Sequence, residues 1–216
     1  GNYLAMVYKG GPIVPVLMGL LLMVVVFSIE RYFVITKATG KGNLDQFMKS
    51  IQASVTKGDI DGALAACDKQ QGSVANAIRS ALVKYQDVKK EGFNSEEAAE
   101  TIHKEIEEAT SLELPMLEKN LVFLSTIASI ATLLGLLGTV IGMIKSFAAL
   151  ATSGTPDPGA LSQGISEALV NTAIGIATSA FAIIVYNILT SKIDSLTYAI
   201  DEIGFSIAQT FAGHKK

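Results

Sequence analysis

Cysteine and histidine are scarce in this 216-residue chain, which has one cysteine, Cys67, and two histidines. One thiol cannot form an internal disulfide or a zinc site of several thiolates, and two histidines offer few metal ligands. Charged residues are also few, at 17% of the chain, and the net charge is −3. We therefore expect no metal and no cofactor, and the charge excludes a nucleic-acid-binding protein with a basic face.

The few charged residues are distributed unevenly along the chain. Three runs carry none, namely residues 10–29, 120–144 and 168–191. Half of all residues are apolar, and the mean hydropathy is +0.42. Each run is close to the roughly 20 apolar residues that cross a bilayer as a helix. The sequence therefore predicts an integral membrane protein with three transmembrane helices.

Lysine and arginine indicate the orientation of these helices. They gather at one end of each run, as Arg31, Lys37, Lys41 and Lys49 after the first, Lys104 and Lys119 before the second, and Lys192, Lys215 and Lys216 after the third. Basic residues near membrane spans favour the cytoplasmic side. This bias predicts an N-terminus outside and a C-terminus inside.

The runs and their flanks divide the chain into seven segments. We predict transmembrane helices over 13–35, 120–147 and 165–191. The remaining segments are an outer-face N-terminal segment over 1–12, a cytoplasmic helical region over 36–119, an outer-face loop over 148–164 and a cytoplasmic C-terminal helix over 192–216.

The cytoplasmic segments show helical periodicity and no strand pattern, so the predicted fold class is all-α. Asp59 and Asn94 are expected helix N-caps, and Gly58 and Gly92 expected helix ends. No turn signal interrupts the pattern from residue 95 to the end of the second span. We therefore expect the second and third spans to extend as continuous helices into a long cytoplasmic bundle, with a bend at Pro115.

Small and hydroxyl side chains form one stripe on each of the last two spans. The stripe of the second span is Ser125, Ala128, Thr132, Gly135, Thr139, Gly142 and Ser146, and that of the third is Ala168, Thr172, Gly175, Ser179 and Ala182. Such stripes allow close helix packing, and hydroxyls at mid-membrane depth also line wet paths or face a polar partner. Both interpretations remain open on the residues alone.

Lys145 and Glu167 are predicted to form an ion pair near the outer rim. If Thr139 and Thr172 lie level on antiparallel helices, Lys145 lies about 9 Å outward of one and Glu167 about 7.5 Å outward of the other, at about 1.5 Å per residue. A membrane carboxylate such as Glu167 is a functional candidate, and its alternative role is a loop-end carboxylate favoured by the helix dipole.

Two segments of these spans resemble a known family. Residues 135–143 read GLLGTVIGM, and residues 164–175 read GISEALVNTAIG, followed by Tyr186 and Asn187. Together they closely resemble the MotA/TolQ/ExbB proton-channel family, and the three-span layout resembles its ExbB and TolQ branch. The chain departs from the pattern at Thr132, where relatives often have proline.

The resemblance implies roles for particular residues. Thr139 and Thr172 match threonines that line the proton path, Glu167 matches the glutamate at the start of the third span, and Ser179 and Thr132 are further candidates for the path. Helix packing is expected at Gly135, Gly138, Gly142 and Gly175.

The resemblance also implies partners. Relatives form homopentamers around single-span ExbD-like proteins in the cytoplasmic membrane of Gram-negative bacteria and energise a TonB-like protein for outer-membrane transport. We expect contacts with membrane lipids and none with nucleic acid.

The residues themselves add one chemical constraint. The second and third charge-free runs contain no Asp, Glu, His or Lys, and a threonine hydroxyl does not titrate at physiological pH. The proton carrier must therefore come from another chain, which the resemblance supplies as a transmembrane aspartate of the partner. No nucleophile and base pair, metal set or cofactor loop indicates an enzyme. The alternatives are a TolQ-like subunit for envelope maintenance and a non-conducting membrane scaffold.

Overall fold

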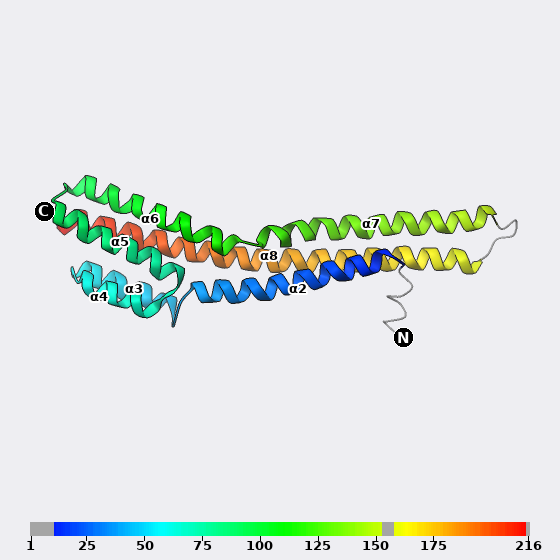
Figure 1. Ribbon diagram of the computed structural model, residues 1–216, viewed down its shortest axis with the longest axis horizontal. Coiled ribbons are helices and arrows are strands. Elements are labelled where there is room, and N and C mark those ends of the chain that lie inside the picture. Colours follow the sequence, from blue (N-terminus) through cyan, green and yellow to red (C-terminus); the bar gives the residue numbers. More distant parts are fainter. Residues whose placement is uncertain (1–10, 153–157, 215–216) are drawn as a thin grey trace. The chain divides into compact units, whose positions relative to one another are not determined.

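The computed structural model describes residues 11–152 and 158–214, and within these ranges it is entirely helical (Figure 1). This confirms the all-α class and the three helices long and apolar enough to cross a membrane. The helices are α2 (Ile13–Ala38), α3 (Leu44–Thr56), α4 (Ile60–Gln70), α5 (Gly72–Glu91), α6 (Ser95–Glu118), α7 (Leu121–Thr152) and α8 (Pro158–His214).

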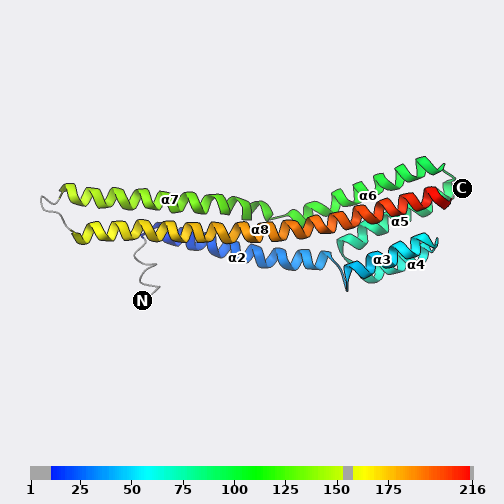
Figure 2. The ribbon, with the colours of Figure 1, turned by 180° about the vertical axis from the view of Figure 1, so that it is seen from behind.

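The chain divides into two compact units. Unit 1 comprises residues 1–30 and 120–188, and unit 2 comprises residues 31–119 and 189–216. Helices α2 and α8 each contribute residues to both units. Within unit 1, α7 and α2 both lie alongside the first half of α8 (Figures 1 and 2).

Unit 1 presents large apolar side chains on its outside. Leu22, Val122, Leu133 and Leu169 are each more than 60% exposed. A soluble protein rarely exposes apolar surface of this extent, whereas a bilayer covers it. The three apolar helices therefore have the surface expected of membrane spans.

Two helices of unit 1 extend beyond the predicted spans. Residues 148–152 belong to α7 and residues 158–164 to α8, so these parts of the predicted 148–164 loop are helical. Alanine, leucine and glutamine in these stretches are compatible with helix, and the sequence offered no charge boundary there. Residues 153–157 of that loop, residues 1–10 of the N-terminal segment, and Lys215 and Lys216 lie outside the described residues.

Unit 2 contains the helices predicted for the cytoplasmic region, with the predicted caps. The Asp59 carboxylate accepts from the amide of Gly62, and the Asn94 side chain accepts from that of Glu97. Gly58 and Gly92 adopt φ values of 74° and 78°, the left-handed conformation that ends helices. The core includes the fully buried Ile51, Val55, Ile78, Leu82, Ile102, Ile193 and Ile207.

Cys67 is buried in this unit. Burial, the largest influence, raises the pKa of its thiol to about 12. The side chain is therefore a neutral, apolar packing group at physiological pH.

The expected continuous helix from residue 95 through the second span is wrong, because α6 ends at Glu118 and α7 begins at Leu121. Lys119 has an extended ψ of 136°, and Asn120 adopts a φ of 69°. Pro115 lies inside α6, and the bend expected there stays a prediction. Asparagine tolerates the left-handed conformation better than most residues, which explains why the break falls there.

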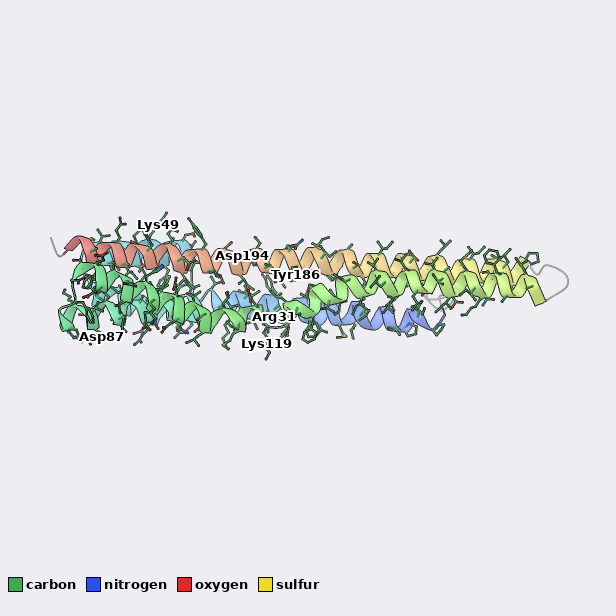
Figure 3. The ribbon with its side chains drawn as sticks, turned by 90° about the horizontal axis from the view of Figure 1, so that it is seen from above. Arg31, Lys49, Asp87, Lys119, Tyr186 and Asp194 are labelled. Carbon is green, nitrogen blue, oxygen red and sulfur yellow. The ribbon has the colours of Figure 1, made fainter. Side chains whose placement is uncertain are left out.

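Two side chains of α2 form hydrogen bonds close to this break between α6 and α7. The buried Arg31, which is labelled in Figure 3, donates through Nη1 to the carbonyl oxygen of Met116 at 3.1 Å in unit 2. In unit 1, Asn120 Nδ2 donates to Glu30 Oε2 at 2.9 Å. The other expected extension is confirmed, because α8 continues without a break for 57 residues.

Candidate functional site

The two small-residue stripes face each other between α7 and α8. A Cβ on Gly135 would lie 3.2 Å from Gly175 Cα, and a Cβ on Gly175 would lie 2.6 Å from the carbonyl oxygen of Ala131. The helix backbones are thus in direct contact at this point. Glycine is required because any side chain would separate the helices.

Gly138 and Gly142 also allow atoms of α8 to approach α7 closely. A Cβ on Gly138 would lie 2.4 Å from Asn171 Cβ, and a Cβ on Gly142 would lie 2.7 Å from the carbonyl oxygen of Gly164. The buried Ser146 continues this contact and donates to the carbonyl oxygen of Gly142 at 3.0 Å. All four glycines predicted for packing therefore lie at close approaches of α7 and α8.

Thr139 and Thr172 meet at the centre of this contact. Their hydroxyls form a hydrogen bond across the two helices, and each hydroxyl also lies 3.2 Å from the carbonyl oxygen of Gly135. Both side chains are partly exposed. The structure thus brings the two predicted threonines together around one carbonyl, within a single chain.

Lys145 and Glu167 form the ion pair that the helix register predicts. Lys145 Nζ lies 2.7 Å from Glu167 Oε1. The Glu167 side chain is 11% exposed, whereas that of Lys145 is 49% exposed. The carboxylate is therefore the buried member of the pair, and Lys145 compensates its buried charge. The ammonium is also exposed at the protein surface.

Gly11, which sequence reasoning missed, completes the surroundings of Glu167. It has a φ of 74°, and its carbonyl accepts from the amide of Val14 in the first turn of α2. A Cβ at this position would lie 1.9 Å from Glu167 Oε1. Glycine before Pro12 was a visible turn signal, but nothing in the sequence linked it to a carboxylate 156 residues later.

We expect Gly11→Ala to displace Glu167 and to reduce several-fold the proton-driven activity that the family resemblance implies. An added Cβ overlaps the carboxylate, and a φ of 74° is unfavourable for alanine. Gly19→Ala is the matched control, because a Cβ on Gly19 meets nothing within 4 Å. Activity per assembled complex and the thermal unfolding midpoint should fall for Gly11→Ala alone. Equal behaviour of the two variants would contradict a contact between Gly11 and Glu167.

Thr132 and Ser179 lie at a different place from the threonine pair. They line an open groove of unit 1 with Ser125, Ser129, Tyr186 and Asn187. The Ser179 side chain is otherwise buried, and its hydroxyl donates to the carbonyl oxygen of Ala128 at 2.5 Å. The hydroxyl of Ser179 thus joins α8 to α7, and a role for Ser179 or Thr132 in the proton path remains a prediction.

Two buried polar side chains of α8 were not singled out from the sequence. Asn171 is 0% exposed and Thr178 is 1% exposed, and their side-chain polar atoms have no hydrogen-bond partner among the described residues. With Glu167 they occupy positions i, i+4 and i+11, a second polar line beside the Thr172 stripe. This spacing, which places three polar residues on one face of a helix, was the sequence signal for these residues. The small-residue pattern of the same helix was stronger and was the one interpreted.

The parts of the chain that the structure describes contain no group of three or more His, Cys, Asp or Glu side chains arranged to hold a metal ion. The polar groups at the α7 and α8 contact are hydroxyls, backbone carbonyls, the Asn171 amide and one ion pair.

Comparison with known proteins connects this arrangement to a family. Relatives include a biopolymer transport protein ExbB homolog of Methanothermobacter thermautotrophicus, 28% identical over 194 residues, covering 90% of this chain and 65% of the relative. ExbB of Salmonella typhimurium is 34% identical over 85 residues, covering 39% of this chain and 35% of the relative. TolQ of Pseudomonas aeruginosa, a Tol-Pal system protein, is 35% identical over 105 residues, covering 49% and 46%.

The chain thus spans about two thirds or less of the length of these relatives. The model of the MotA/TolQ/ExbB proton channel family matches residues 73–202, which is more than half of the chain. The matched region contains the threonine pair, the ion pair and the four packing glycines. The chain belongs to the MotA/TolQ/ExbB proton channel family, whose members are channel subunits and not enzymes.

Proposed function

We propose that this protein is a subunit of an ExbB-like energy-transducing channel in which Thr139 and Thr172 line the proton path. The observation that carries the proposal is the threonine pair around the Gly135 carbonyl, in two spans that contain no Asp, Glu, His or Lys over 120–144 and 168–191. Hydroxyls orient water and bind a carboxylic acid but carry no charge themselves. A second chain must supply the titrating group.

The surroundings of Thr139 support access from such a second chain. Thr139 lines an open groove whose other lining residues are apolar, namely Val140, Met143, Ile144 and Phe147. An apolar transmembrane helix with a single carboxylic acid matches this surface. The proposed partner is therefore an ExbD-like single-span protein with a transmembrane aspartate.

Family membership and the distribution of basic residues support a proposed assembly and orientation. We place the protein in the cytoplasmic membrane as a homopentamer, with its N-terminus outside and its C-terminus inside. Each proton that crosses yields about 2.3 kcal/mol per 100 mV of membrane potential. This energy is passed to a TonB-like protein for outer-membrane transport.

Reconstitution in liposomes tests the division of roles. The subunit alone should leave an imposed pH gradient intact, whereas the subunit with its single-span partner should dissipate it, and an Asp→Asn change in the partner should restore the barrier. Proton flux through the subunit alone at the rate of the full complex would contradict the proposal. Tight assembly with the partner and no flux at all would favour a non-conducting scaffold.

A TolQ-like role is the second candidate, favoured by the 35% identity to TolQ of Pseudomonas aeruginosa. Complementation separates the two roles. Rescue of TonB-dependent uptake in a strain lacking ExbB and TolQ supports the ExbB-like role. Rescue of detergent resistance alone supports envelope maintenance.

A further inference from the structure

We propose that unit 2 binds the headgroup of an anionic phospholipid in a groove between the end of α2 and the middle of α8. We call it the Tyr32–Lys192 groove. The residues used below are Tyr32, Thr36, Thr39, Lys192 and Ser195, all of which line it. The ligand is a lipid whose headgroup carries a phosphate and hydroxyl groups, such as phosphatidylglycerol.

The residues of α2 and α8 that line the groove come shortly after the charge-free run in each helix. Tyr32 follows the run over 10–29 by three residues, and Lys192 is the first charged residue after the run over 168–191. Tyr32 and its neighbour Phe33 are 51% and 67% exposed. Exposed aromatic side chains at the ends of apolar helices are typical of the level of lipid headgroups.

Lys192 supplies the positive charge at this level. Its Nζ lies 4.8 Å from the centroid of the Tyr32 ring, a cation–π contact that positions the ammonium without neutralising it. Among the described residues, no carboxylate forms a salt bridge with Lys192, and none lines the groove. The ammonium is thus available to a lipid phosphate.

The hydroxyls of the groove complement a headgroup that donates hydrogen bonds. Thr36 Oγ1 donates to the carbonyl oxygen of Tyr32 at 2.7 Å, Thr39 Oγ1 to that of Ile35 at 3.2 Å, and Ser195 Oγ to that of Ser191 at 2.8 Å. Each hydroxyl has used its hydrogen, so its oxygen remains an acceptor. A glycerol headgroup offers the matching donors, while its phosphate faces Lys192.

Zwitterionic lipids fit this arrangement less well. The ammonium or choline group of such a lipid would lie in the same groove as Lys192, where like charges repel. One lysine near an anionic membrane surface contributes about fivefold in binding. We therefore expect about fivefold selectivity for phosphatidylglycerol over phosphatidylcholine.

The absence of tryptophan from the chain allows a direct test. In the 216-residue chain, Tyr32→Trp introduces the sole tryptophan and keeps an aromatic ring next to Lys192. The variant is reconstituted in phosphatidylcholine vesicles that contain increasing fractions of acyl-brominated phosphatidylglycerol or acyl-brominated phosphatidylcholine, and quenching of the tryptophan gives the relative affinity. Brominated phosphatidylglycerol should quench at about fivefold lower mole fraction.

Two charge variants in this background identify the origin of the selectivity. Lys192→Gln should bring the ratio of the two affinities to about one. Lys119→Gln is the matched control, because it removes the same charge from an exposed lysine that does not line the groove, and it should leave the ratio unchanged. A ratio near one in the parent, or an equal loss in both variants, would overturn the proposal.

Two further measurements complete the test. Added millimolar inorganic phosphate should not change the ratio of the two affinities. If added phosphate abolished the selectivity, the groove would be assigned to free phosphate instead of lipid. Native mass spectrometry of the protein without the Tyr32→Trp change should detect retained phosphatidylglycerol, and less of it in Lys192→Gln than in Lys119→Gln. These readouts need no proton flux, so their failure leaves the proposed function standing.

Discussion

Thr172→Val should reduce proton-driven activity at least tenfold while the subunits still assemble. Valine has nearly the shape of threonine, so the α7 and α8 contact keeps its packing, but the hydrogen bonds to Thr139 and to the Gly135 carbonyl are lost. A tenfold loss corresponds to about 1.4 kcal/mol of barrier. The measurement is proton flux per reconstituted complex, with subunit composition checked by native mass spectrometry.

Conservative replacements serve as controls for this variant. Thr172→Ser retains the hydroxyl and should keep most of the activity, and Thr139→Val should resemble Thr172→Val because both side chains belong to one hydrogen-bonded group. Normal flux in both valine variants would instead assign the two hydroxyl stripes to helix packing alone.

Replacing either member of the Lys145–Glu167 pair should separate stability from activity. Lys145→Ala leaves the buried carboxylate without its partner, and an unsatisfied buried group costs about 1–3 kcal/mol. Glu167→Ala leaves a lysine that is already half exposed, so the loss of stability should be smaller. Activity per assembled complex should nevertheless fall more in Glu167→Ala, because Glu167 is a membrane carboxylate and matches the glutamate at the start of the third span in the family pattern.

Thermal unfolding and proton flux of the two variants measure these effects. The double variant Lys145→Ala/Glu167→Ala should be more stable than Lys145→Ala, since it removes the unpaired carboxylate. Equal losses of flux in both single variants would indicate that the pair has a structural role only.

Features determined by local sequence could be predicted well. The charge-free runs located all three long apolar helices, and Asp59 and Asn94 marked real helix N-caps because a side-chain oxygen can satisfy a free amide. The Lys145–Glu167 pair also followed from simple helix geometry, since residues level on antiparallel helices share a depth.

Features that depend on a distant contact or on one backbone angle escaped prediction. The break at Lys119 and Asn120 lies in an unbroken hydrophobic pattern, and a single left-handed asparagine leaves no mark on that pattern. The contact between Gly11 and Glu167, and the burial of Asn171 against Gly138, each join residues more than 30 positions apart. Periodicity indicates which face of a helix is buried but not which residue of another helix contacts that face.

The threonine pair has a consequence for the direction of its hydrogen bonds. Two hydroxyl hydrogens are shared among three oxygens, those of Thr139, Thr172 and the Gly135 carbonyl. One hydroxyl donates to the carbonyl and the other donates to the first hydroxyl, and exchanging the two threonines gives an equivalent arrangement. In both arrangements each hydrogen is already used, and one hydroxyl oxygen keeps its lone pairs free.

The pair thus accepts a hydrogen bond from outside more readily than it donates one. A neutral carboxylic acid carries the hydrogen that such an acceptor needs, whereas an ionised carboxylate carries none and gains a bond only if an internal one breaks. If a partner acid lies beside them, as proposed, the two hydroxyls would bind its protonated form better than its ionised form, although neither hydroxyl changes its own charge.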